Sequence, residues 1–241
     1  MLAPWINRIL PHLNKPSLYG LIQLQDWWRS VRGRGGGAWP AALAAQRELF
    51  FVHVGANRAG INDPIFRQII LRDWRGILVE PQEAALAHWR QTLRHYPGLY
   101  YAQTTLAERA EERDFFYIEP EAGLPEWITQ VSSLRREVTQ ETAGKIPGAR
   151  VRGKRLTCLS LDQLLAQYQV RKFDVLVIDA EGADAQILKG LSLDRYRPQL
   201  IRYEHYHLDP EERRATEARL KRYGYEVVRE GYDTLAERVG K

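Results

Sequence analysis

The sequence predicts an α/β protein built on a doubly wound, Rossmann-like sheet with a helical arm at its N-terminus. Short apolar runs typical of buried strands alternate with longer segments in which apolar residues recur at helical spacing. A glycine-containing turn follows the first strand, and an acidic residue ends the second. The length of 241 residues, with 44% hydrophobic and 27% charged residues, suits one sizeable domain with a short appendage.

Strands and helices alternate from residue 48 onward. The first half predicts strand 48–55, helix 60–74, strand 76–81, helix 83–96 and strand 98–105. Residues 108–158 are rich in turn signals, and we expect an irregular insertion or a hairpin there. The second half predicts helix 160–168, strand 173–182, helix 183–190, strand 199–206, helix 210–224 and a strand pair within 225–239. Helices between successive strands imply a parallel sheet, which binds ligands at the carboxyl ends of its strands.

The predicted domain boundary separates an arm, residues 1–47, from a main domain, residues 48–241. Residues 1–48 hold six basic and two acidic side chains, so most of the net charge of +5 lies there. Four of the seven tryptophans belong to the arm, which ends in the flexible sequence RGRGGG. We expect the arm to pack on the main domain or to mediate self-association into a homo-oligomer, with peripheral membrane contact as the alternative.

No apolar run approaches the roughly 18 residues of a membrane-spanning helix, and the first residues lack the pattern of a secretory signal. We therefore expect a cytoplasmic protein. The chain has a single cysteine, Cys158, which cannot form an internal disulfide. Its strand-like surroundings favour a buried, inert thiol.

The first turn and the end of the second strand suggest a nucleotide-type ligand. Gly55, Asn57 and Gly60 follow the first strand and let the backbone approach a ligand closely. Glu80 ends the second strand, where a carboxylate accepts hydrogen bonds from the paired hydroxyls of a ribose. Alternatively, the glycines only permit tight packing and Glu80 caps the next helix. Asn57 replaces the second glycine of a dinucleotide motif, and no lysine follows Gly60, so neither NAD nor ATP is expected.

Several motifs resemble those of the FkbM family of S-adenosylmethionine-dependent methyltransferases. They are FVHVGANRAG, GILVEPQ, SSL at 132–134, LSLDQLL and FDVLVIDAEGADAQILKG, in the family's order over about residues 49–233. The resemblance implies a class I methyltransferase domain that transfers a methyl group to an acceptor oxygen, often on a sugar or secondary metabolite. It places Gly55, Asn57 and Gly60 around the methionine part of the cofactor, Glu80 on its ribose, and Asp179 and Glu181 beside the reaction centre.

Three positions depart from the family pattern. His53 stands where aspartate is usual, Val177 where lysine is common, and Asp184 where glutamate is usual. His53 is either a changed contact at the amino end of the cofactor or a satisfied core histidine between two valines. These departures keep open an alternative function, a catalytically decayed module that binds a membrane or a partner.

A hydroxyl acceptor needs a general base or a metal that removes its proton. Asp179 and Glu181 end one predicted strand, and Glu204 and His205 end the next, so they meet at one sheet edge. We take His205 as the first choice of base and Asp179 as the second, with His207 read as solvated.

Three alternatives remain at this sheet edge. Asp179 caps the helix that begins near Ala183, Glu204 pairs with Arg202 or another surface arginine, or Asp179, Glu181 and Glu204 together hold a divalent cation.

The remaining expectations concern partners. Basic residues gather before the helix at 160–168 and suit an anionic acceptor, although a solvated face is the alternative; they are Lys145, Arg150, Arg152, Lys154 and Arg155. The Pro-Pro-aromatic motif with which nucleic-acid methyltransferases hold a flipped base is absent. We therefore expect a small-molecule acceptor and no nucleic acid.

Overall fold

The structure, a computed structural model, describes residues 6–31, 39–40, 43 and 45–239. The chain forms two compact units, residues 1–103 and 104–241. The described part of the arm belongs to the first unit, together with the first three strands. The boundary suggested after residue 47 stays a prediction about which segment folds independently.

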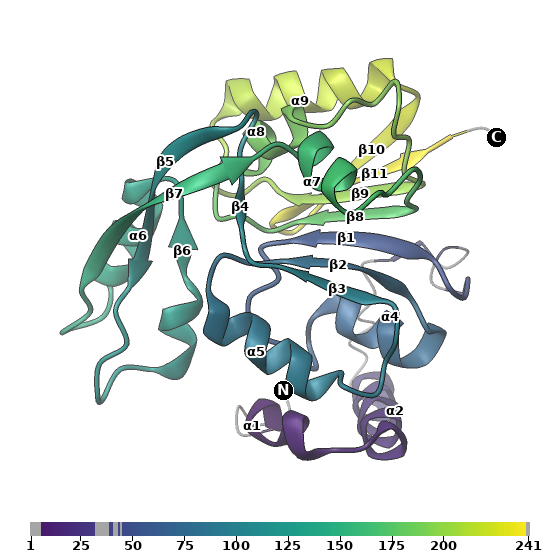
Figure 1. The fold of residues 1–241 in the computed structure, drawn as a ribbon, viewed down its shortest axis with the longest axis vertical. Coiled ribbons are helices and arrows are strands. Elements are labelled where there is room, and N and C mark those ends of the chain that lie inside the picture. Colours follow the sequence, from purple (N-terminus) through teal and green to yellow (C-terminus); the bar gives the residue numbers. More distant parts are fainter. Residues whose placement is uncertain (1–5, 32–38, 41–42, 44, 240–241) are drawn as a thin grey trace. The chain divides into compact units, whose positions relative to one another are not determined.

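The first unit contains three parallel strands in the order β1-β2-β3. Figure 1 shows them side by side and pointing the same way. The strands are β1 (Phe50–Val54), β2 (Arg75–Val79) and β3 (Leu99–Ala102), and the helices between them are α4 (Pro64–Arg72) and α5 (Glu83–Thr92). This strand–helix–strand alternation confirms the predicted Rossmann-like α/β class.

Local sequence explains where α4 begins. The Asp63 side chain accepts a hydrogen bond from Phe66 N at 2.8 Å, and Pro64 occupies the first helical position. The observed helix therefore starts four residues later than the predicted helix 60–74, and residues 60–63 belong to the loop after β1. Apolar side chains of α4, including Ile65 and Phe66, are fully buried.

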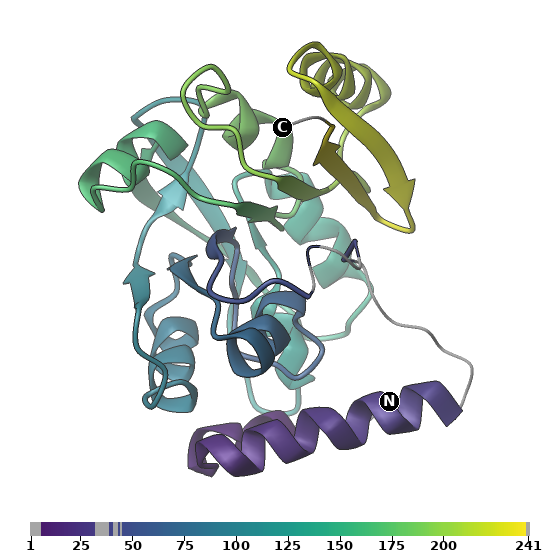
Figure 2. The ribbon, with the colours of Figure 1, turned by 90° about the vertical axis from the view of Figure 1, so that its right-hand side faces the viewer.

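The N-terminal arm is helical and packs within the first unit. It comprises α1 (Ile6–Ile9), the short 3-10 helix η1 (Leu10–His12) and α2 (Lys15–Val31). η1 contacts α5 and α2 contacts α4; Figure 2 shows α2 as the long purple helix. Among the described residues, no helix is long and apolar enough to cross a membrane. Membrane contact and self-association through the arm stay predictions.

The second unit contains four strands in the order β10-β11-β9-β8. β8 (Val175–Ile178) and β9 (Leu200–Glu204) are parallel, whereas β11 (Asp233–Arg238) pairs antiparallel with both β9 and β10 (Tyr225–Glu230). The helices are α7 (Leu161–Gln167), α8 (Asp184–Lys189) and α9 (Pro210–Arg222). Each of these helices lies within a segment predicted from periodicity.

Residues 105–159 of the second unit form a separate sheet in the order β4-β7-β5-β6. Its strands are β4 (Thr105–Leu106), β5 (Glu111–Ile118), β6 (Ser132–Ser133) and β7 (Val151–Leu159), with η2 (Glu126–Gln130) and α6 (Arg136–Gly144) between β5 and β7. β5 and β7 pair antiparallel along nearly their whole lengths, but η2, β6 and α6 lie between them, so the segment is a four-stranded insertion and not a simple hairpin. Cys158 lies buried in β7, and burial raises its pKa to about 11, which makes the thiol a poor nucleophile.

Candidate active site

The loop after β1 makes the sharp turn that its glycine predicts. Gly55 has φ 72° and Asn57 has φ 48°, both in the left-handed region. Glycine enters that region without a side-chain clash, and asparagine tolerates it better than most residues. The backbone amides of Gly55 and Ala56 both donate to Val79 O, at 3.0 and 3.1 Å, so the turn is fastened to the end of β2.

Glu80 connects this loop to the start of α5. Its Oε2 accepts from Asn57 N and its Oε1 from Gln82 N, each at 3.0 Å. The residue is only 3% exposed. Gln82 is the residue before α5, so Glu80 braces the chain where it enters that helix, without a side-chain cap hydrogen bond at α5 itself. Each carboxylate oxygen can accept a second hydrogen bond, so this bracing role does not exclude a ribose contact.

Two further side chains lie against the same loop. The indole Nε1 of Trp89, on α5, donates to Ala56 O at 3.0 Å and to Asn57 O at 2.8 Å. At the other end, a Cβ added to Gly60 would meet the Asn7 side chain at 3.5 Å, an ordinary contact. No strain therefore demands glycine at position 60, and its place at the cofactor stays a prediction.

His53 lies in the interior of β1 and is 3% exposed. Its Nδ1 is 3.8 Å from Asp63 Oδ2, which belongs to the carboxylate that also caps α4. A carboxylate therefore lies near this position even though residue 53 itself is a histidine. Whether His53 contacts a cofactor stays a prediction.

In the second unit, a strained turn follows β8. Glu181 has φ 49° and Gly182 has φ 93°. Ser133 Oγ donates to Glu181 O at 2.6 Å and accepts from Arg135 N at 2.9 Å, so β6 clamps the turn. A Cβ on Gly182 would lie 3.1 Å from the Cβ of His207. Only glycine satisfies both the backbone angle and this close approach.

Asp184 joins the turn to the end of β9. Its carboxylate accepts from Gly182 N at 3.3 Å and from Glu204 N at 3.1 Å, and the residue is fully buried. Burial, followed by the nearby charge of Asp179, raises the pKa of Asp184 to about 8. The shorter acidic side chain at this position thus has a structural role in aligning two strand ends.

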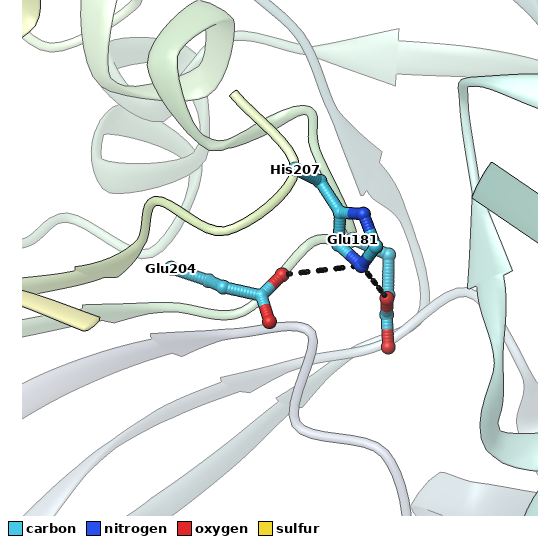
Figure 3. A group of neighbouring side chains, drawn as sticks. All are labelled: Glu181, Glu204 and His207. Carbon is cyan, nitrogen blue, oxygen red and sulfur yellow. Dashed lines mark ion pairs between the residues drawn. The ribbon is translucent and has the colours of Figure 1, made fainter. Parts of the chain in front are cut away.

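Glu181, Glu204 and His207 form a compact polar cluster in this unit (Figure 3). His207 Nε2 lies 3.2 Å from Glu181 Oε2 and 4.0 Å from Glu204 Oε2. Burial and neighbouring carboxylates, Asp179 foremost, raise the pKa of Glu204 to about 9. The raised pKa favours the protonated form of Glu204 at neutral pH, and the Glu181 carboxyl group is the nearer of the two to the imidazole.

The same cluster is the described set best suited to a divalent cation. Its three ligand atoms all lie within 4.8 Å of one another. It includes Glu181 and Glu204 of the set that the sequence suggested, with His207 in place of Asp179. Asp179 itself is exposed at the end of β8.

His205 and His207 lie in different environments. His205 is 7% exposed, its Nδ1 is 2.9 Å from Thr234 Oγ1, and its backbone carbonyl accepts from Arg213 Nη2 at 3.1 Å. Burial lowers the pKa of His205. His207, which the sequence suggested to be solvated, is instead largely buried, with 16% of its side chain exposed.

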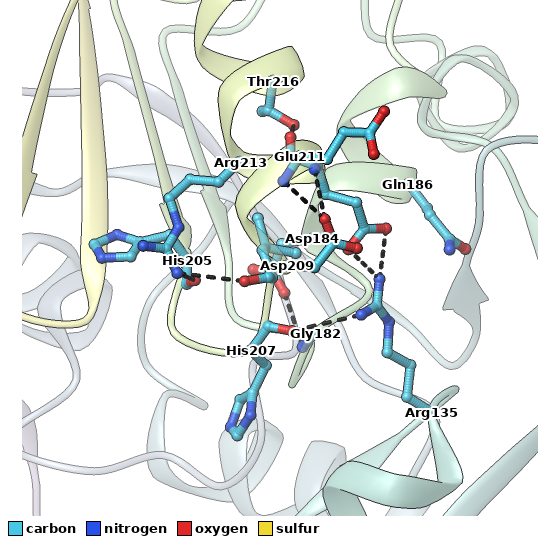
Figure 4. A network of polar contacts seen from close by, with 12 residues as sticks. Arg135, Gly182, Asp184, Gln186, His205, His207, Asp209, Glu211, Arg213 and Thr216 are labelled. Carbon is cyan, nitrogen blue, oxygen red and sulfur yellow. Dashed lines mark hydrogen bonds and ion pairs between the residues drawn. The ribbon is translucent and has the colours of Figure 1, made fainter.

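Arg135 positions the segment that carries His207 (Figure 4). Its Nη2 donates to both carboxylate oxygens of Glu212 at 2.6 Å, and its Nη1 donates to His207 O at 3.4 Å. Asp209 accepts from the backbone amides of Glu211 and Glu212 and so caps α9. The backbone of His207 is thereby tied both to the segment after β6 and to the beginning of α9.

Two of the alternative interpretations at the sheet edge are wrong. The residue before α8 is Ala183, and no side chain caps that helix, so Asp179 is not its cap. Arg202 Nη2 donates to Asp233 Oδ2 at 2.6 Å, on the neighbouring strand β11, and not to Glu204. The long guanidinium reaches across to the paired strand, which the sequence alone does not locate.

The basic residues before α7 are mostly neutralised. Four form ion pairs with carboxylates of the same unit: Lys145 with Glu141, Arg150 with Glu121, Arg152 with Glu119 and Arg155 with Asp114. The ammonium of Lys154 lies 5.6 Å from the ring centres of both Phe115 and Tyr117. This pairing reduces the positive charge available to an anionic acceptor, which stays a prediction.

Comparison with known proteins identifies the family. The family model of the methyltransferase FkbM domain matches residues 53–227, which include the loop after β1, Glu80 and the cluster around His207. This chain belongs to the FkbM methyltransferase family. The FkbM resemblance drawn from the sequence motifs is thereby confirmed. No relative was found among the curated proteins.

Two solved structures are similar to this FkbM-family chain. The methyltransferase FkbM of Methylobacillus flagellatus KT has a TM-score of 0.49 and 12% identity, over 85% of this chain and 46% of that one. A precorrin-6y C5,15-methyltransferase of Geobacter metallireducens GS-15 has a TM-score of 0.38 and 13% identity, over 82% of this chain and 87% of that one. This chain thus spans less than half the length of the first.

Sequence reasoning missed three residues that organise the second half of the site. Ser133 lies in the SSL motif, but its contact with the turn at Glu181 joins residues 48 positions apart. Asp184 was noted only as a departure, although its two backbone contacts explain an acid there. His207 stands two residues after His205, and only the turn that follows β9 distinguishes their surroundings.

Proposed function

We propose that this chain is an S-adenosylmethionine-dependent methyltransferase that methylates a hydroxyl group of a sugar or secondary metabolite. The observation that carries the proposal is the buried Glu80 carboxylate. It follows β2 inside an FkbM domain and holds the left-handed turn at Asn57 by a 3.0 Å hydrogen bond.

The chemistry of the loop fits the cofactor. Gly55 leaves the turn without a side chain at its start, and a carboxylate such as that of Glu80 suits the vicinal hydroxyls of a ribose. Gly55, Asn57 and Gly60 would hold the methionine part, with His53 behind them in β1. When bound, S-adenosylmethionine supplies a methyl group on a cationic sulfur; the acceptor oxygen attacks the methyl carbon in line, and the sulfur leaves as the neutral thioether.

His207 is the general base that the surroundings favour. Glu181 Oε2 lies 3.2 Å from Nε2, which favours a proton on that nitrogen and leaves the lone pair on Nδ1. When the imidazole takes the hydroxyl proton, the Glu181 carboxylate stabilises the resulting cation. His205, the first choice from sequence, has its Nδ1 engaged with Thr234 and is less suited to the role. Asp179 remains the second choice of base.

The test is a methyl-transfer assay on the full chain. Radiolabelled S-adenosylmethionine is offered with sugars, phenols and aliphatic hydroxy metabolites, with and without EDTA, while calorimetry measures binding of S-adenosylhomocysteine and NADH. The proposal predicts binding of S-adenosylhomocysteine, no binding of NADH, and transfer to at least one hydroxyl acceptor. Cofactor binding without transfer to any acceptor would favour the decayed binding module. Loss of transfer in EDTA, restored by Mg²⁺, would favour a metal on Glu181, Glu204 and His207 over base catalysis.

A further inference from the structure

We propose that the N-terminal arm is a built-in brace for the loop after β1 and that Asn7 is a positioning residue for it. The effect on cofactor binding rests on the proposed function, whereas the effect on the loop itself does not. The arm lies before the region matched by the family model, which begins at residue 53.

The arm is anchored by apolar packing. Its buried apolar side chains include Ile6, Leu10, Leu18 and Ile22, each with an exposure of 4% or less. Burial of large apolar side chains is the main stabilising contribution in folding, and here it holds a short helical segment in place. α1 and η1 lie next to α5 at the bottom of Figure 1. The arm is therefore fixed well enough to support other groups.

Polar groups of the arm contact the loop's end. Asn7 Oδ1 accepts from Ile61 N at 3.3 Å, and its amide lies beside Gly60. Gln25, 3% exposed, donates from Nε2 to Asn62 Oδ1 at 2.7 Å. Two consecutive loop residues are thus held by two separate parts of the arm.

Asn7 is itself held by the helix that holds the loop's beginning. His88 Nε2 lies 3.1 Å from Asn7 O. The next residue of α5, Trp89, donates to the carbonyls of Ala56 and Asn57. α5 therefore fixes the beginning of the loop directly and its end through Asn7.

A loop of this kind benefits from external support. Asn57 adopts a left-handed angle, and for a residue other than glycine such a conformation persists only where the surroundings enforce it. A loop that is already ordered loses less conformational freedom when a ligand binds. The arm therefore orders the loop before the cofactor binds.

The experiment compares Asn7→Ala, Asn7→Asp and Gln23→Ala in the full chain. Asn7→Ala removes the acceptor for Ile61 N, Asn7→Asp keeps an acceptor oxygen, and Gln23 is an exposed residue of α2 that serves as control. Without ligand, hydrogen exchange of the Ile61 amide is expected to be about ten-fold faster in Asn7→Ala and near wild type in the other two. The dissociation constant for S-adenosylhomocysteine is expected to rise about three- to ten-fold in Asn7→Ala only.

The outcomes distinguish the brace on the loop, the effect of the brace on cofactor binding, and the proposed function. Unchanged Ile61 exchange in folded Asn7→Ala would overturn the brace. Faster exchange with no binding of S-adenosylhomocysteine by wild type would keep the brace and refute the proposed function. Tight wild-type binding that Asn7→Ala leaves unchanged, despite a looser loop, would refute the link to the cofactor. If Asn7→Ala does not fold, Gln25→Ala removes the donor to Asn62 Oδ1 instead, and unchanged exchange of the amides of residues 60–62 in that variant would overturn the brace.

Discussion

Replacing Glu80 with glutamine tests the account of the first unit, because it keeps the shape of the side chain and removes one acceptor. Both carboxylate oxygens accept a backbone N–H, from Asn57 and Gln82. In Glu80→Gln, one of these amides faces an NH₂ group that cannot accept. The loop then loses one charge-assisted hydrogen bond and the other becomes neutral.

The magnitude follows from those two contacts. A hydrogen bond to a charged group contributes about 1.5–3 kcal/mol, and a neutral one about 1 kcal/mol. We therefore expect Glu80→Gln to lower the free energy of unfolding by about 2–4 kcal/mol. A further loss of about 1–3 kcal/mol is expected in binding, which corresponds to roughly a 5- to 150-fold weaker affinity for S-adenosylhomocysteine.

Urea unfolding and titration calorimetry measure the two effects separately. Glu83→Gln is the matched control, because Glu83 lies three residues later with 53% of its side chain exposed and undergoes the same charge change. We expect Glu83→Gln to remain within about 0.5 kcal/mol of wild type in both assays. An affinity for S-adenosylhomocysteine within about two-fold of wild type in Glu80→Gln would refute the ribose assignment. An unchanged unfolding midpoint would refute the bracing role.

Three further predictions concern the second unit. His207→Asn should lower kcat by about 10²- to 10⁴-fold while leaving the affinity for S-adenosylhomocysteine near wild type, and an unchanged kcat would exclude this residue as the base. Gly182→Ala should destabilise the protein by about 1–3 kcal/mol in urea unfolding. Gly224→Ala is the control and should cost less, because Gly224 has a similar positive φ but open space where a Cβ would be added. Equal losses in the two variants would contradict the close approach of Gly182 to His207. Because burial raises the pKa of Glu204 to about 9, well above its unfolded value near 4, its stabilising contribution is complete below about pH 4 and is lost as pH rises through about 9. Urea unfolding between about pH 6.5 and 8.5 should therefore show that the free energy of unfolding falls as pH rises. Glu204→Gln should flatten that slope by as much as about 1 kcal/mol per pH unit. A slope in Glu204→Gln identical to that of wild type would show that Glu204 is ionised in the folded protein.

Local signals in the sequence were sufficient for most elements. Apolar runs located β1, β2, β8 and β9, and the turn at Gly55 followed from the need for a left-handed residue after a strand. The predicted helix ends were less accurate where a capping side chain fixes them. At α4, the Asp63 side chain caps the helix, which begins at Pro64. The strand predicted over 98–105 ends at Ala102, and Thr105 belongs to the other sheet.

Contacts between distant segments were not visible in the sequence. Arg135 and Glu212 are 77 residues apart, and their pairing depends on how β6 and α9 fold. One alternative paired Glu204 with Arg202, but Arg202 on β9 donates to Asp233 on the neighbouring strand β11. The choice between His205 and His207 likewise depended on burial, which only the folded chain defines.

The most direct measurement is a crystal structure of the full chain with S-adenosylhomocysteine. We expect the ribose hydroxyls within hydrogen-bond distance of the Glu80 carboxylate and the amino acid part of the ligand along residues 55–60. A ligand bound elsewhere, or a loop after β1 that contacts no ligand in crystals grown at saturating concentration, would contradict this expectation.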